Sequence, residues 1–195
     1  MHPSKNHQTW KDTMLWQTLT EHRADAADLE SVRATLSKCM PDIERILSSA
    51  GTSPLDFTLH DSGHSFRVAQ QMAQLVGSDL LPKLSYYEIA LLLLAAYLHD
   101  IGMSPEQKRV FSHYSYLISG SSPDVTQTEI LAFQRWLDEE GRGITPPISK
   151  GPYEADTLHL ASELITYYCR FRHNDWSEEW IRQNLSAEKL GTYAG

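Results

Sequence analysis

The sequence has little cysteine, no excess of basic residues and no long apolar segment. Its two cysteines, Cys39 and Cys169, have neither the spacing of metal ligands nor the density of a disulfide scaffold. No signal-peptide apolar core follows Met1, so we expect a cytoplasmic protein. The 17 Lys and Arg residues against 25 Asp and Glu give a formal charge of −8, which argues against an extended nucleic-acid surface or a membrane surface. A small anionic substrate in a local pocket is compatible with this charge.

The sequence also lacks the apolar–polar alternation of strands and any internal repeat. Apolar residues recur instead at intervals of three and four, which predicts an all-α fold, a bundle of about seven to nine helices. Residues 1–52 are expected to form an N-terminal helical segment and residues 53–195 the main domain. Pro41 is expected to kink or split one helix. The expected helices cover residues 9–23, 26–49, 63–77, 85–101, 105–118, 126–140, 156–173 and 177–186.

The helix expected over residues 85–101 has the sequence SYYEIALLLLAAYLHDI and is apolar on every side over residues 89–98. Ser85 and Glu88 have the spacing of a capping box at its start. The apolar run is too short to cross a bilayer, which indicates a helix at the centre of the bundle. We therefore expect its middle residues to be nearly inaccessible to solvent, namely Leu91–Leu94, Ala95, Ala96 and Leu98.

His99 and Asp100 stand at the polar end of this apolar helix. A buried carboxylate beside an imidazole is costly unless a partner compensates the charge, and a divalent metal is one such partner. Taken alone, the pair favours a simpler interpretation, in which Asp100 caps the turn at Gly102 and His99 binds a backbone carbonyl. His64 changes this balance, because it opens the amphipathic helix expected over 63–77. If the two helices pack antiparallel, His64 meets His99 and Asp100, and three ligands converge.

The segments HSFRVAQQMAQL and LLLLAAYLHDIGM together resemble the HD-domain metal-dependent phosphohydrolases over residues 57–103. The resemblance implies an HD-like helical bundle in which His64, His99 and Asp100 hold a metal. It also implies hydrolysis of a nucleotide or other phosphate ester by metal-activated water, with Asp100 as a catalytic residue that orients the water. Mixed imidazole and carboxylate ligation suits Mn, Fe, Co, Ni or Zn, and waters would also admit Mg.

The order of a tryptophan-containing helix, a long helix, FTLHDSGHS and the His-Asp helix resembles a narrower bacterial subgroup. Its members stand at the N-terminus of larger ATPase-containing conflict or defence proteins. This resemblance implies further domains of a longer protein as partners, beside the small phosphate-containing substrate.

The segment RFRHND, residues 170–175, resembles the later histidine-bearing helix of HD domains. The resemblance implies that His173 is a ligand of a second metal or a phosphate contact. The alternative is a solvent-facing histidine at a helix C-terminus. Helical periodicity points His173 away from the stripe of Leu164 and Tyr168. We nevertheless expect His173 to lie near the site, because the following Asn-Asp pair is a natural helix stop that would let the imidazole turn inward.

Three arginines are candidates for binding the substrate. Arg67 stands one turn after His64, and its guanidinium would bind a phosphoryl oxygen, with an exposed salt bridge as the alternative. Arg170 and Arg172 flank Phe171 close to His173 and are substrate-binding candidates on the same argument.

His60 precedes His64 by one helical turn in the sequence LHDSGHS. A zinc metalloprotease needs Glu after the first histidine, and Asp61 stands there in a turn-like sequence, which argues against that class. His60 is a catalytic candidate that faces the substrate or supports a ligand, and a surface loop is the alternative.

The HD pattern has a closing Asp further along the chain, and no residue after His173 fits it, because Asp175 follows too closely. Two interpretations stay open: the domain over 53–195 is incomplete at its C-terminus, or it is a reduced member of its family. The gap also supports a second hypothesis, a non-catalytic HD-like module that senses a nucleotide or partner and regulates an attached domain.

Overall fold

The computed structural model describes residues 8–23, 27–49, 62–103, 107–122, 124–140, 143–149 and 155–185. These residues form helices and no strand, so the predicted all-α fold is confirmed. No helix among them is long and apolar enough to span a membrane. The elements are η1 (Trp10–Asp12), α1 (Met14–Glu21), α2 (Ala27–Ser49), α3 (Ser62–Val76), η2 (Leu81–Lys83), α4 (Tyr86–Leu98), η3 (Ile101–Met103), α5 (Gln107–Ser119), α6 (Gln127–Glu139) and α7 (Ala155–Asn184).

Hydroxyl side chains fix where several helices begin. At the start of α4 the predicted capping box is present: the Glu88 backbone N–H donates to Ser85 Oγ over 3.3 Å, and the Ser85 N–H donates to Glu88 Oε2 over 2.7 Å. Thr13 and Thr126 cap α1 and α6 with the side chain alone, which accepts from the backbone N–H of Trp16 and Glu129 respectively. These bonds satisfy backbone donors that a helix start leaves without a partner.

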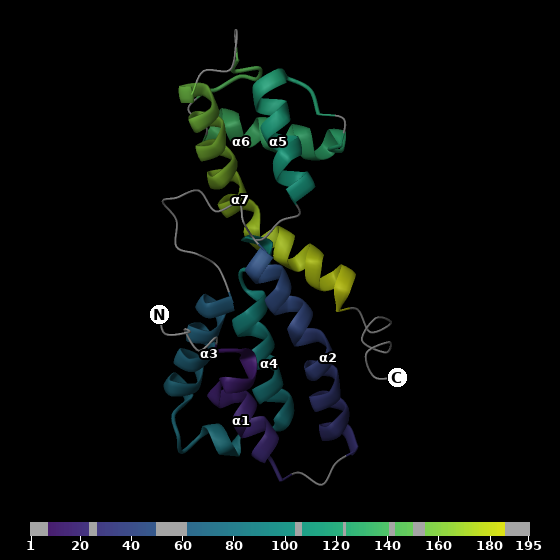
Figure 1. Cartoon of the computed structure of the whole chain (residues 1–195), viewed down its shortest axis with the longest axis vertical. Helices are drawn as coiled ribbons and strands as arrows, with labels where there is room; N and C mark the ends of the chain where they lie inside the picture. The colour runs from purple at the N-terminus through teal and green to yellow at the C-terminus, as the bar shows by residue number, and fades with distance from the viewer. Residues whose placement is uncertain are drawn as a thin grey trace, which may run out of the picture.

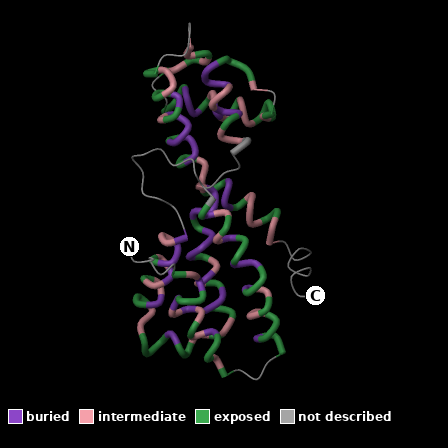
Figure 2. The backbone as a smooth tube through the Cα atoms, in the orientation of Figure 1, coloured by how far each residue is buried: buried purple, intermediate pink, exposed green. Residues whose placement is uncertain are grey.

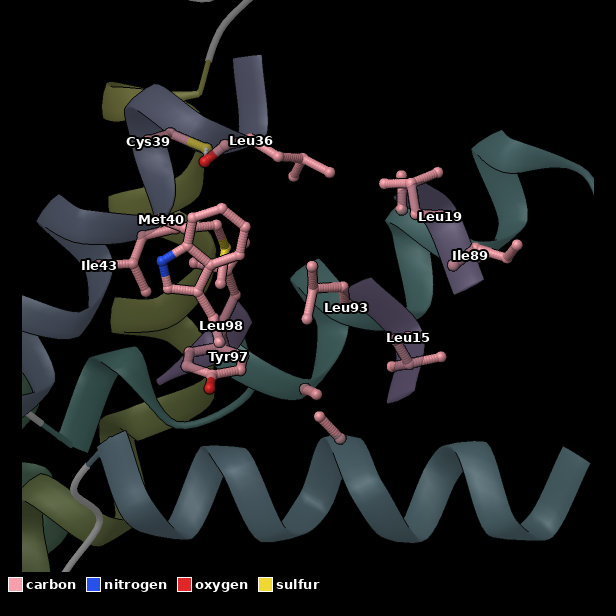
Figure 3. Packing of buried hydrophobic residues seen from close by; sticks show 14 of the residues in the cluster. Leu15, Leu19, Leu36, Cys39, Met40, Ile43, Ile89, Leu93, Tyr97 and Leu98 are labelled. Atoms are coloured by element: carbon pink, nitrogen blue, oxygen red, sulfur yellow. Dashed lines mark hydrogen bonds between the residues drawn. The ribbon is translucent and has the colours of Figure 1, made fainter. Parts of the chain in front are cut away.

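Helices α1 to α4 form one bundle around α4, which packs against the other three (Figure 1). Figure 3 shows how the core is built from side chains of all these helices. Its largest fully buried members include Trp10, Leu15, Met40, Leu93 and Tyr97. The N-terminal helices therefore share their core with the helices that carry His64 and His99.

A second core lies between α5, α6 and the first part of α7 (Figure 1). It is largely aromatic: the rings of Phe133 and Tyr168 lie 4.5 Å apart, and Phe133 stacks on Trp136 at 6.0 Å. Buried residues concentrate inside the two groups of helices, as Figure 2 shows.

Helix α7 joins the two cores and corrects one sequence expectation. Two helices with a break at the Asn-Asp pair were expected, but α7 is one helix across residues 155–184. Packing on both sides of the pair overrides its weak preference for a helix end. Before and after it, Tyr168 and Trp176 are buried in the second core, and Ile181 packs against the first. Asp175 itself pairs with Arg172 one turn earlier, 2.9 Å between Oδ2 and Nε.

Two further expectations about single helices are settled. Helix α2 continues through Pro41 and is not split. The even burial expected along α4 is wrong: Leu93 and Ala96 are inaccessible, but Leu91 is 65% exposed and Ala95 is also exposed. The reason is that α1, α2 and α3 cover three sides of α4, whereas its remaining side faces a groove.

His113 on α5 is a buried histidine of the second core, 2% exposed. Its Nδ1 donates to the Arg109 carbonyl over 2.8 Å, and its ring lies 5.1 Å from that of Tyr168. Burial lowers the pKa of His113, although the Glu129 carboxylate, 3.7 Å from Nε2, acts in the opposite direction. Folding therefore favours the neutral form of this imidazole.

We expect His113 to make the protein less stable in mild acid. Because its pKa is lowered on folding, its contribution is complete above the ordinary value of about 6.5 and is lost as the pH falls through the lowered value. One such group changes the free energy of unfolding by at most about 1.4 kcal/mol per pH unit. Urea unfolding of the wild type and His113→Gln between about pH 5 and 7.5 measures this slope. The slope should be smaller in His113→Gln and unchanged in His159→Gln, where the histidine is exposed; equal slopes in both variants would contradict the assignment.

Candidate metal centre

The end of α4 places His99 and Asp100 side by side. The His99 ring donates from Nδ1 to the Ala96 carbonyl over 3.1 Å, which turns Nε2 toward Asp100. His99 Nε2 lies 2.8 Å from Asp100 Oδ2. The Asp100 residue is 8% exposed, so its carboxylate is largely removed from water. The apolar sequence before the pair explains this burial, because α4 runs through the first core and ends at the site.

His64 reaches the same carboxylate from α3. It lies in the first turn of that helix, and its Nε2 is 3.4 Å from Asp100 Oδ2. The rings of His64 and His99 are 5.4 Å apart. One ligand atom from each of His64, His99 and Asp100 lies within 4.8 Å of the others, so the first turn of α3 meets the end of α4 as expected.

His173, on α7, lies near the second carboxylate oxygen of Asp100. Its Nε2 lies 3.9 Å from Asp100 Oδ1, and its Nδ1 donates to the Arg170 carbonyl over 2.5 Å. The expected reason for this position, a helix end at residue 174, is wrong. Instead, two sides of α7 make contacts. Tyr168 and Trp176 face the second core, and His173 faces η3 on a different side of the helix.

A close contact between η3 and α7 holds this arrangement. A Cβ added to Gly102 would lie 2.1 Å from the His173 carbonyl oxygen and 2.6 Å from the Ser177 nitrogen, so only glycine fits. The Gly102 N–H donates to Ser177 Oγ over 2.9 Å, and that hydroxyl donates to the His99 carbonyl over 3.3 Å. Gly102 and Ser177 thus tie His99 and His173 to each other through the backbone.

The electrostatics of the site follow from the buried carboxylate. The hydrogen bond to Asp100 raises the pKa of His99, against the opposing effect of burial. Without another cation, the site therefore favours protonation of His99 more than water favours it for a free imidazole, and the positive charge would compensate that of Asp100. A divalent cation would take over that compensation and displace the proton.

The donor set fits a divalent transition metal. His99 and His173 donate from Nδ1 to backbone carbonyls, which leaves Nε2 as the ligand atom, as metal-bound histidines generally do. Three imidazoles around one carboxylate suit Mn, Fe, Co, Ni or Zn better than Mg. Among the described residues, no second carboxylate belongs to the cluster, and the further group near Asp100 is the imidazole of His173.

Of the other predicted site residues, some lie close in sequence to the histidines of the cluster and one is engaged elsewhere. Arg67 is exposed on α3, one turn after His64, and Arg170 is exposed on α7, one turn before His173. Arg172 is not brought to the cluster: it donates to Tyr168 Oη over 3.1 Å and pairs with Asp175. His60 lies outside the described residues.

Gly102 and Ser177 lie between η3 and α7 beside the cluster, and the sequence does not mark either of them as a residue that positions the site. The available signals were weak: the glycine directly follows the His-Asp-Ile sequence, and Ser177 stands one helical turn after His173. Neither signal predicts a role in the site without knowledge of the contact between η3 and α7.

The fold and the cluster define an all-helical protein of the HD type, in which His and Asp side chains from separate helices converge. The family model HD-CE matches residues 55–194, which is most of the chain, and the protein belongs to this HD-domain family. No curated protein and no solved structure matches the chain significantly.

We expect Gly102→Ala to disturb metal binding more than stability alone would explain. The added methyl group must push η3 from α7, because its nearest neighbours are backbone atoms. Overpacking of this kind costs roughly 1–3 kcal/mol, and the displaced ligands should lower Mn or Zn affinity about tenfold or more. Calorimetric metal titration and urea unfolding measure the two effects.

Gly143→Ala is the matched control for this substitution. Gly143 has a φ of +71° and no atom within 4 Å of an added Cβ, so alanine strains the backbone at a distance from the cluster. It should lower stability by about 1 kcal/mol and leave metal affinity unchanged. Wild-type metal affinity in Gly102→Ala would show that the contact does not position the ligands.

Proposed function

We propose that the protein is a divalent-metal-dependent phosphohydrolase that acts on a phosphate ester, a nucleotide being one candidate. The observation that carries the proposal is the convergence of His64, His99 and Asp100 from two helices within 4.8 Å. Membership of an HD-domain family supports the same chemistry.

The cluster's own residues supply the binding chemistry. His64, His99 and Asp100 would hold the cation, with His173 as an additional ligand or phosphate contact. When bound, a divalent cation polarises a phosphoryl oxygen and lowers the pKa of its water ligand toward neutrality. Asp100 Oδ2 faces His64 and His99, while Oδ1 faces His173. This arrangement would suit a carboxylate that is shared between two cations.

Residues around the cluster complete the proposal. Arg67 and Arg170 lie on the exposed surface one turn from His64 and His173, where a guanidinium would bind phosphate. His60 is proposed to face the substrate. Asp100 would orient the attacking water, because its burial leaves little bulk solvent to compete for the hydrogen bond.

Removal of one ligand should abolish both metal binding and turnover. We expect Asp100→Asn and His99→Ala to lose bound metal and to lower hydrolysis of aryl phosphates and nucleotides with Mn or Co by at least about 100-fold, beyond the roughly 10–100-fold effect of losing an outer contact. Elemental analysis and phosphate release are the measurements. His159→Ala is the control, because His159 is an exposed histidine on α7.

Two outcomes of this experiment would redirect the assignment. Equal metal content in the wild type and both ligand variants would exclude the site. Metal and nucleotide binding without turnover would favour the regulatory alternative, a module that senses a ligand for an attached domain.

His173→Ala should separate the additional ligand from the three-residue cluster. Because His64, His99 and Asp100 are left intact, we expect at least one metal equivalent to stay bound while turnover or binding of a second equivalent falls about tenfold or more. The free energy of unfolding of the metal-free protein should change by less than about 1 kcal/mol, since the side chain is partly exposed. Full turnover in this variant would remove His173 from the site.

A further inference from the structure

An apolar groove of about 1100 Å³ lies between α2, α4 and the C-terminal part of α7. Its floor is buried: Leu36, Cys39, Ala90 and Leu98 are 2%, 3%, 6% and 6% exposed. Burial also raises the pKa of Cys39 to about 11, so this residue contributes a neutral thiol. The groove is therefore a concave apolar surface and not a ridge of single exposed side chains.

The walls of the groove hold apolar side chains in contact with water. Leu91 is 65% exposed and Tyr87 is 51% exposed, both on the side of α4 that no helix covers. Ile181 of α7 and Leu185, which directly follows that helix, form the opposite wall. Apolar surface gathered in a concavity of this size is typical of sites for organic ligands.

One end of the groove coincides with the candidate metal centre. His99 lines the groove and also contributes Nε2 to the cluster around Asp100. Asn174, which directly follows His173, and Ser177 line the groove beside His99, and the charged pair Glu178 and Arg182 lines it further along α7. A single ligand can therefore present a charged head to the cluster and an apolar body to the groove.

We propose that the groove binds the organic part of the substrate, so that the enzyme acts on phosphate monoesters of apolar alcohols, with an alkyl or aryl group, in preference to polar esters. This inference rests on the proposed phosphohydrolase function. In the reaction, the oxygen of water forms a new bond to phosphorus and the bond from phosphorus to the ester oxygen breaks. A proton from the water goes to the leaving oxygen, and the products are the alcohol and inorganic phosphate.

The binding test uses octylphosphonate and ethylphosphonate, whose carbon–phosphorus bond is not hydrolysed. With the full chain and Mn, we expect octylphosphonate to bind roughly tenfold or more tightly, because its additional methylenes leave water. Leu91→Asp and Ala95→Asp should each remove most of this preference and leave ethylphosphonate affinity unchanged. Both positions are exposed, so the substitutions do not disturb the core.

Two matched variants locate the two parts of the ligand. Leu75→Asp alters a leucine that is 88% exposed on α3 and does not line the groove, and it should change neither affinity. Asp100→Asn should weaken both phosphonates to a similar degree, since it acts on the shared charged head.

The outcomes distinguish this inference from the function on which it rests. Equal affinity for the two phosphonates, or an octyl preference that survives both groove variants, would overturn the apolar-ester assignment even if octyl and ethyl phosphate are both hydrolysed. Groove-dependent binding without hydrolysis of octyl phosphate would support the ligand class and reject the phosphohydrolase. Sedimentation of the wild type as a dimer that Leu91→Asp dissociates would identify the groove as an interface between copies and overturn the proposal.

Discussion

The contact between the Gly102 backbone and α7 is the constraint on which the site depends. A glycine without Cβ lets η3 lie against the His173 carbonyl and the Ser177 amide, where any larger residue would collide with backbone. Ser177 Oγ then joins the two segments, because it accepts from Gly102 and donates to the His99 carbonyl. A residue with no functional group of its own therefore permits the close approach of η3 to the part of α7 that carries His173.

The same contact explains how α7 serves two cores. Residues of the second core and of the site lie on different stripes of this helix: Tyr168 and Trp176 pack among aromatic rings, and His173 and Ser177 face η3. Arg172 illustrates the division. Although it precedes His173 in the sequence, its guanidinium lies over the Trp176 ring and binds Tyr168 Oη, so it stabilises the second core.

Much of the fold and the centre of the site could be predicted because their causes are local. The Ser85–Glu88 capping box set the start of α4, and an apolar helix that ends in His99-Asp100 required a partner for the carboxylate, which His64 supplied. Exposure of Leu91 and continuity of α7 could not be predicted, because both depend on which sides of a helix receive neighbours. The helical periodicity around Tyr168 correctly predicted that His173 points away from the second core. It could not predict that Asp100 lies on that other side of the helix.

The two fixed imidazoles also bear on how the site tolerates thermal motion. His99 and His173 each donate Nδ1–H to a carbonyl within their own helix, Ala96 and Arg170 respectively, so each ring is restrained by local backbone and not by a distant loop. Side chains restrained in this way lose little rotamer freedom when a ligand arrives. Movement of these two rings relative to each other then requires movement of their helices, which the packing of two separate cores opposes. Fluctuations of the ligand geometry should consequently be small in amplitude and collective, with α7 moving as a unit relative to the end of α4.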